Sequence, residues 1–321
     1  MRYYDISITA PGATTPFRRW SSHPNGQLDP GALNVELDMP ILPFDTPSGG
    51  QSLIIEGIPL SDVSQAQQFT GMTLTMLAGM RKGLPLANPL QSGLILWGNI
   101  FQSYGNWEGT DMSLCFVITG VNYFEEQKNL ILNWPAGTPL STALTNMFRI
   151  AYPSIPVSMN IGSNLVQSNN FLHTERTLEG MAYKIAETTQ GLFQQKVYIT
   201  LQRGKFVVHD KTYKPDPVVL HFTDLIGQPT WIAPDTMQVK TVLRADLEVG
   251  SKIIMPDGMQ NHPNAPGLIS TQGNAYPSSI KYKTAFKNTF QIKELRQVGN
   301  YRATDASAWC TIFNCLATVD E

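Results

Sequence analysis

The chain has 321 residues, which allows two or three modules, because one hydrophobic core rarely grows beyond roughly 250 to 300 residues. Its 42% hydrophobic and 10% aromatic residues exclude a disordered chain. Charged residues make up only 15%, and 23 basic against 25 acidic residues leave a net charge of −2, so we expect no specific nucleic-acid binding.

Residues 1–125 have the texture of antiparallel β-structure, because short apolar or alternating runs are separated by Gly, Pro and Asn clusters. The first run alternates instead of forming the apolar block of a signal peptide, and no later stretch is long enough to span a bilayer. We therefore expect synthesis in the cytoplasm and no stable membrane anchoring. The runs are residues 3–8, 35–37, 52–55, 73–77 and 94–118.

Three segments interrupt these runs. A short helix is expected between residues 60 and 71, with Ser61 as its N-cap and Gly71 as its end. Residues 11–34 and 40–50 are rich in Pro and Gly and too long for ordinary connections. Each is either an arm lying on another subunit or a flexible loop.

In residues 126–216 apolar residues at helical spacing appear beside short strand-like runs, and this pattern predicts a small α+β module with two helices. In the first helix Thr138 is the expected N-cap, and Pro139 suits the first helical position. In the second, Thr177 is the expected N-cap and Gly191 the end. Strands follow at residues 196–201 and 205–209. The two apolar stripes, which predict core packing, are Leu140, Ala143, Leu144, Met147 and Ala151, then Leu178, Met181, Ala182, Ile185 and Ala186.

Residues 217–321 return to β-structure and predict a second β module. Residues 256–277 form a long stretch rich in Gly, Pro and Asn, which in a compact domain is either functional or mobile. The apolar runs are residues 218–222, 239–243, 252–255, 286–295 and 309–316.

A repeated motif lies near the end of both β modules. Residues 105–113 and 299–307 share five identical positions and one aromatic position, beginning with Gly105-Asn106-Trp107 and Gly299-Asn300-Tyr301. An apolar run precedes and follows each copy, as in a Gly-Asn hairpin between two closing strands. The two β modules are therefore expected to be one fold used twice.

No sequence motif for catalysis, a cofactor or a metal is present, so we expect no enzyme, no cofactor and no metal. The five histidines lack the spacing of joint metal ligands. Three cysteines, Cys115, Cys310 and Cys315, are expected to be reduced and buried. Acids that could in principle form a glycosidase pair, but which we expect to be solvated or turn-forming, are Asp111, Asp224, Glu294 and Asp305.

The stretch from residue 222 to 254 resembles the hub and tail-tip proteins of contractile-tailed bacteriophages. It reads Phe-Thr-Asp-Leu-Ile-Gly-Gln-Pro-Thr-Trp at 222–231, then a strand at 237–243, then a second strand start at 247–254. In those proteins a turn with Gly227 and Pro229 at the matching positions precedes a barrel strand, and Gly250 matches the later strand start. The closing hairpin at 290–317 and the end of the first module at 98–101 fit the same order of parts.

The resemblance implies two tube-like antiparallel β-barrel domains, residues 1–125 and 217–321, flanking the helix-containing module. It implies a baseplate hub that assembles as a homotrimer with pseudo-sixfold symmetry, connects the hexameric tail tube to the trimeric spike and lines the DNA channel. Implied partners are the tube protein, the spike or tail-tip protein, and tape-measure and baseplate wedge proteins. The implied location is the virion tail.

Function would then lie in subunit interfaces, with aromatic side chains as anchors. The charge-poor surface fits either coverage by neighbouring subunits or a β-rich protein. Core packing remains the alternative for each aromatic anchor, and Gly227 and Gly250 are expected in turns. The anchors are Trp20, Trp107, Trp231 and Tyr301. Two other functions stay open: a receptor- or glycan-binding virion module, and a tail-associated peptidoglycan hydrolase.

Overall fold

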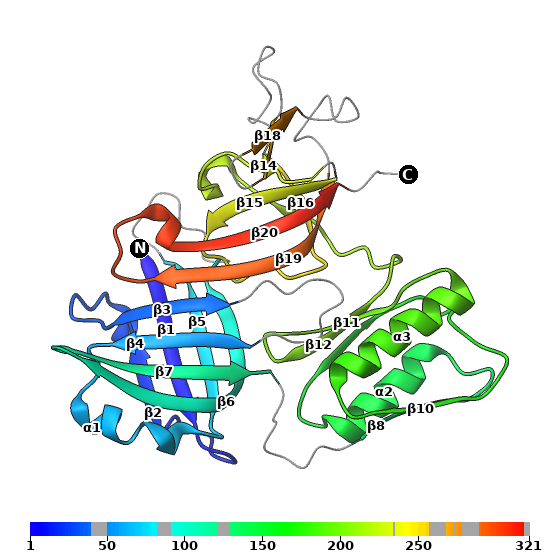
Figure 1. The fold of residues 1–321 in the computed structure, drawn as a ribbon, viewed down its shortest axis with the longest axis horizontal. Coiled ribbons are helices and arrows are strands. Elements are labelled where there is room, and N and C mark those ends of the chain that lie inside the picture. Colours follow the sequence, from blue (N-terminus) through cyan, green and yellow to red (C-terminus); the bar gives the residue numbers. More distant parts are fainter. Residues whose placement is uncertain are drawn as a thin grey trace.

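The computed structural model describes residues 1–39, 50–81, 91–120, 129–233, 235–256, 268–271, 274–277 and 289–317. The protein is mainly β, with a large, almost entirely antiparallel sheet and a separate helix-containing part, as the sequence predicts (Figure 1). The predicted boundary at residue 125, most of residues 40–50 and most of residues 256–277 lie outside the described residues.

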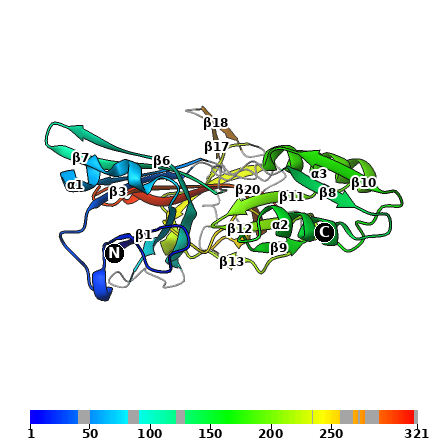
Figure 2. The same cartoon turned by 90° about the horizontal axis from the view of Figure 1, so that it is seen from below.

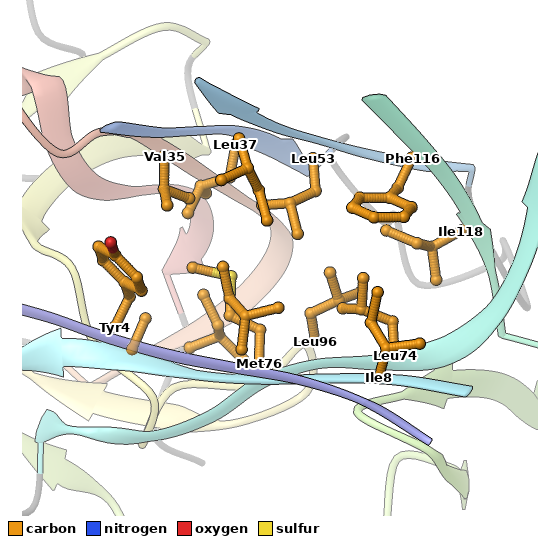
Figure 3. Close-up of a cluster of buried hydrophobic side chains, with 14 of the residues drawn as sticks. Tyr4, Ile8, Val35, Leu37, Leu53, Leu74, Met76, Leu96, Phe116 and Ile118 are labelled. Atoms are coloured by element: carbon orange, nitrogen blue, oxygen red, sulfur yellow. The ribbon is translucent and has the colours of Figure 1, made fainter. Parts of the chain in front are cut away.

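The first β module is a sheet that folds over its own core. Alternating side chains put one face of each strand inside, so Val35, Leu37 and Leu53 from one layer meet Leu74 and Leu96 from the other (Figure 3). Its elements are β1 (Arg2–Thr9), β2 (Arg18–Ser21), β3 (Asn34–Met39), β4 (Gln51–Glu56), α1 (Leu60–Ser64), β5 (Thr73–Met80), β6 (Gly93–Glu108) and β7 (Asp111–Thr119).

Within residues 11–34, β2 pairs with β1 of the same chain, so this part of the segment belongs to the sheet of the first module. Arg19 also forms an ion pair with Asp5 (Nη2 to Oδ2, 2.6 Å). The predicted helix is shorter than expected. It begins after Pro59, not at a Ser61 cap, ends at Ser64 and continues as a 3-10 turn.

The middle module packs its two helices on strands around a second core (Figure 1). Thr177 caps α3 as predicted, since its side chain accepts from Gly180 N. Gly191 does not end that helix, which continues to Phe193 and is capped by Gln194 with φ 55°. In α2 the cap is Pro139, one residue later than predicted. The elements are β8 (Leu130–Trp134), α2 (Leu140–Ala151), β9 (Val157–Asn160), β10 (Phe171–Glu175), α3 (Leu178–Phe193), β11 (Tyr198–Gln202) and β12 (Lys205–His209).

The second β module repeats the strand order of the first. In the first the neighbours run β3-β4-β7-β6-β5-β1, and in the second they run β14-β15-β20-β19-β16-β13, with the strands of both in the same chain order. One pairing differs, because β13 and β16 are parallel where β1 and β5 are antiparallel. Its strands are β13 (Val218–Val219), β14 (Thr230–Trp231), β15 (Thr236–Val242), β16 (Lys252–Ile254), β17 (Leu268–Thr271), β18 (Asn274–Pro277), β19 (Thr289–Asn300) and β20 (Trp309–Ala317).

The repeat extends to single hydrogen bonds. Ile100 O accepts from Gly71 N at 2.8 Å, and Ile292 O accepts from Gly250 N at 2.9 Å. Both glycines have positive φ, 82° and 93°, which a side chain would strain. A β-bulge follows each isoleucine, in β6 and in β19. The expectation of one fold used twice is thus met at the level of strand order and local geometry.

The repeated motif identified the correct hairpins but not their turns. Gly105 and Asn106 lie inside β6, and the chain turns at 109–110. Gly299 and Asn300 end β19, before a connection that includes a 3-10 turn. Trp107 follows the bulged Ile100 by as many residues as Gly299 follows the bulged Ile292, so Trp107 and not Gly105 is the structural counterpart of Gly299. The alignment of the two motif copies by sequence is therefore shifted by two residues from the alignment by structure.

Candidate functional site

The two β modules are joined edge to edge, because the end of β19 pairs with β3. Gly299 lies opposite Leu37 in this pairing. A Cβ on Gly299 would lie 2.7 Å from Trp309 Cζ3 and 2.8 Å from Leu37 Cγ, so only glycine fits. Figure 2 shows β7, β6, β3 and β20 as one continuous layer. We call the β19–β3 pairing the module joint.

Polar side chains bridge the module joint on its outer face. Arg296 holds Asp38, with Nε 2.7 Å from Oδ1, and this hydrogen bond lowers the pKa of Asp38. Asn300 donates to Glu36, whose pKa is raised by burial and by the nearby charge of Glu56. The outer face at the joint therefore carries one ion pair, Arg296 with Asp38, beside two acids, Glu36 and Glu56, that accept hydrogen bonds from the uncharged Asn300 and Asn34.

Aromatic rings close the joint on its inner side. Trp309 Nε1 donates to Gly79 O at 3.1 Å, which ties β20 to β5 of the first module. Tyr301 packs edge-on against both Tyr4 and Trp309, with ring centroids 4.9 and 5.9 Å apart. Arg2 donates to the carbonyl of Tyr301 at 3.1 Å. Tyr301, predicted as an interface anchor, thus anchors the contact between modules of one chain.

A buried ion pair stabilises the contact between the two β modules. Arg244 lies 2.8 Å from Asp224 and 2.6 Å from Asp246, and the side chains of Arg244 and Asp224 are each 3% exposed. Gln91 of the first module donates to Asp224. Buried charges need such partners, because an unpaired charge in the interior is costly.

The middle module attaches to the segment that follows this ion pair. Gln202 exchanges two hydrogen bonds with the backbone of Val249, at 2.8 and 3.1 Å. Arg203 donates to the carbonyls of Ala245 and Leu247 and forms an ion pair with Glu248. Residues 243–251 therefore contact all three modules, and this fixes their relative positions.

The remaining predicted site residues divide between core and surface. Trp231 is buried at 2% exposure in the core of the second module, so it is not an exposed anchor. Trp20 is half-buried against the first core. Gly227 has φ +80° in the turn before β14, with Pro229 two residues later, as expected of a turn glycine. Gly105 lies against Val63, where a Cβ would come within 2.5 Å of Cγ1.

Trp107 is the predicted anchor that the structure leaves exposed, at 65%. It lies near the end of β6, beside Asn106, and its Nε1 donates to Gly109 O at 2.9 Å. Tyr104 on the same strand is 48% exposed. The end of the β6–β7 hairpin is thus an aromatic, solvent-exposed surface.

The candidate chemical groups do not gather in one place. Asp224 belongs to the buried ion pair, Glu294 accepts from Asn314 at 2.9 Å, and Asp111 and Asp305 are exposed at the ends of different hairpins. The three cysteines are free and buried, as predicted. Over the described ranges no group of His, Cys, Asp and Glu is placed to hold a metal ion, and no helix there is long and apolar enough to cross a membrane.

Comparisons with known proteins match this architecture. No family model and no curated sequence matches the chain. A solved tail protein from Neisseria meningitidis MC58 is 11% identical with a TM-score of 0.52, covering 98% of this chain and 96% of that one. The 43 kDa tail protein of prophage MuSo2 from Shewanella oneidensis is 8% identical with a TM-score of 0.52, covering 99% and 98%.

A third similar structure is the c3393 protein of Escherichia coli, a type VI secretion component described as structurally similar to the T4 bacteriophage tail proteins gp27 and gp5. It is 9% identical with a TM-score of 0.51, covering 98% of this chain and 77% of that one. A chain of the Francisella PdpA–VgrG complex is also similar, at 8% identity and a TM-score of 0.53. The match covers 65% of that chain. The chain therefore has the fold of phage tail and type VI secretion proteins of the gp27 type, as its sequence resemblance implies.

Proposed function

We propose that this protein is a structural subunit of a contractile phage tail baseplate, a homotrimeric hub between the hexameric tail tube and the trimeric spike. The observation that carries the proposal is the repeated strand order: two modules of one topology are joined edge to edge in a single chain. Three such chains present six similar modules, so one ring can match sixfold symmetry on one side and threefold symmetry on the other.

The rigid junction supports this role. A symmetry adaptor needs its two modules at a fixed angle, since a hinge between them would spoil the sixfold match. The module joint, the shared first core with Leu243 and Trp309, and the buried Arg244–Asp224 pair all oppose such a hinge.

The outer face of the joined sheet is the surface we assign to the DNA channel. At the joint Arg296 is paired with Asp38, Glu36 and Glu56 hydrogen-bond to uncharged asparagines, and beyond it Ser52 and Gln102 are uncharged. A wall without a basic excess lets a polyanion pass without holding it. The tube-like barrel shape of each module, the tube, spike, tape-measure and wedge contacts, and the virion location belong to the same proposal.

Mass and shape in solution test the proposal first. The purified chain, alone and mixed with the tube and spike proteins of the same phage, is expected to give a particle of three times 35.6 kDa or a larger complex containing it. End-on electron-microscopy averages should show six lobes. A chain that stays monomeric in every mixture and is absent from images of the tail end would overturn it.

The two other readings have their own assays. Saccharide binding by a stable monomer would favour a receptor- or glycan-binding module. Cell-wall hydrolysis that is lost in Asp111→Asn or Glu294→Gln would favour a hydrolase. Neither activity is expected.

A further inference from the structure

In the part of the chain that the structure describes, the middle module shares no apolar core with the β modules. The core of the first β module takes in Leu243 and Trp309 of the second, so the two β modules are fused through buried side chains. The core of the middle module takes its buried members from residues 130–208, and among the described residues Trp97 is the one side chain from a β module that packs against it. Modules of one chain that meet at a small or polar interface usually move relative to each other.

The middle module is attached through one face of the β11–β12 hairpin. The face with Phe206 and Val208 belongs to the middle core, and because side chains alternate along a strand, the remaining residues point to the opposite face. The hairpin lies on the side of the middle module nearest the β modules (Figure 1). We call the opposite face the docking face, and only Val207 in it is aliphatic. Its residues are Tyr198, Thr200, Gln202, Lys205, Val207 and His209.

The docking face meets the second module mainly through hydrogen bonds and ion pairs. Gln202 exchanges two hydrogen bonds with the backbone of Val249, at 2.8 and 3.1 Å. Lys205 Nζ lies 3.0 Å from Glu248 Oε1. At the turn of the hairpin, Arg203 donates to two backbone carbonyls of the second module and also pairs with Glu248. Water replaces such partners when a contact opens, so each of these bonds holds the modules together only weakly.

His209 lies at the end of the docking face and is 2% exposed. Its imidazole lies against Gly250 of the second module, where a Cβ would be 3.5 Å from Nε2. Tyr198 and Tyr213 of the middle module lie beside it, with ring centroids 5.5 and 6.0 Å away. From the second module, the charge of Glu248 acts on Tyr213. Separation of the modules would bring this imidazole into contact with water.

Protonation of His209 is unfavourable while the modules are in contact. Burial outweighs the attraction of Asp210 and lowers the pKa of His209 from 6.5 to about 4. The Asp210 carboxylate already accepts hydrogen bonds within the middle module, and Glu248 is already paired with Lys205 and Arg203. A proton therefore binds more readily when the ring is in water. The contribution of His209 to the contact is complete above pH 6.5 and is lost as the pH falls to 4.

We propose that the middle module undocks from the joined β modules as one body, and that protonation of His209 drives the opening. The open state exposes the docking face and residues 245–250, while the cores and the module joint stay intact. The connection that follows β12, residues 210–217, contains two prolines and forms no helix or strand, as is typical of a linker between modules. Every contact involved lies within one chain, so the opening does not depend on the proposed trimer.

Three backbone amides report on the contact and on the modules at its two sides. Val249 N donates to Gln202 Oε1 across the contact, at 2.8 Å. Gly250 N, one residue later, donates within the second module at 2.9 Å. Val197 N donates to Thr189 Oγ1 within the middle module, at 3.1 Å. Undocking exposes the first amide to water and leaves the other two protected.

Hydrogen exchange of the full-length protein, resolved to single residues, measures the opening as a protection factor, the intrinsic exchange rate divided by the observed rate. At pH 7 we expect the protection factor of Val249 to be at least about tenfold below those of Gly250 and Val197. Between pH 7 and pH 5 it should fall about twentyfold, because the open form, with a pKa of 6.5, takes up a proton that the docked form, with a pKa of about 4, does not. In His209→Gln the same change of pH should lower it less than about threefold.

The outcomes separate undocking from unfolding and from local fraying. A protection factor of Val249 equal to those of Gly250 and Val197 would mean that the contact opens only when the protein unfolds, and it would overturn the proposal. A low value that is the same at pH 7 and pH 5 would mean fraying at Val249 alone, and it would overturn the proposal too. A pH dependence that persists in His209→Gln would overturn the role of His209. A low, pH-dependent value that loses its pH dependence in His209→Gln supports the proposal.

A matched pair of variants tests the contact itself at pH 7. Arg203→Met removes the donor to two carbonyls of the second module, and we expect the protection factor of Val249 to fall at least about tenfold. Arg149→Met is the control, because Arg149 is exposed on α2 and donates to Asn146 of its own helix, so this variant should behave as the wild type. Equal protection of Val249 in the two variants would contradict the proposal. The pH comparison in the wild type decides the matter if Arg203→Met does not fold.

Discussion

Gly299 of β19 and Leu37 of β3 lie directly opposite each other in the pairing that joins the two β modules, with no room for a Cβ between Leu37 and the ring of Trp309. This contact explains why glycine stands at residue 299, although the chain does not turn there. It also makes the module joint sensitive to a single methyl group.

Gly299→Ala is therefore expected to destabilise the protein by about 1–3 kcal/mol, because the added methyl group overpacks the joint. Urea unfolding followed by tryptophan fluorescence measures the change. Gly191→Ala is the matched control: Gly191 lies within α3, and a Cβ added there would meet nothing within 4 Å, so this change should be neutral or stabilise by up to about 1 kcal/mol. Equal effects at both positions would show that the joint is looser than described.

The buried ion pair should matter far more than the exposed one. Arg244→Met leaves Asp224 buried without its charged partner, and we expect a loss of about 3–5 kcal/mol in the free energy of unfolding. Arg296→Met removes a pair whose side chains are 41% and 49% exposed, so its loss should stay below about 1 kcal/mol. Chemical denaturation of both variants at the same pH makes the comparison. A similar cost for the two would contradict this assignment.

His209 makes stability depend on pH. Burial lowers its pKa from the usual 6.5 to about 4, so below pH 6.5 the unfolded chain takes up a proton that the folded chain does not. Its stabilising contribution is complete above pH 6.5 and is lost as the pH falls to 4, up to about 3 kcal/mol. The difference in unfolding free energy between the wild type and His209→Gln, measured at pH 7 and pH 4.5, isolates this effect. A difference that is the same at both pH values would refute it.

The helix caps give a test of local structure. Thr177→Ala removes the side-chain acceptor for Gly180 N and should cost about 1 kcal/mol. Thr138→Ala changes the residue before the Pro139 cap of α2, where the structure shows no side-chain cap bond, and should cost less than half as much. Thermal unfolding followed by circular dichroism compares them. A larger loss of stability in Thr138→Ala than in Thr177→Ala would indicate that Thr138 is the N-cap of α2, as the sequence predicted.

The sequence determined the features that depend on neighbours along the chain. Alternating runs predicted β-structure in both outer modules, the apolar stripe of α3 predicted a buried helix face, and Thr177 predicted its start. The repeated motif located the two closing hairpins, because both copies begin in the strand that enters each one. Each of these signals lies within a few residues, where side-chain periodicity and capping act.

The tertiary structure alone decided which edges meet. Gln297 pairs with Met39 across most of the chain, and no local pattern in either strand specifies the other. The same holds for the burial of Trp231, the exposure of Trp107 and the two-residue shift between sequence match and structural match. Strand pairing between distant segments depends on the shape and packing of whole sheets, which a period of two along one strand does not encode.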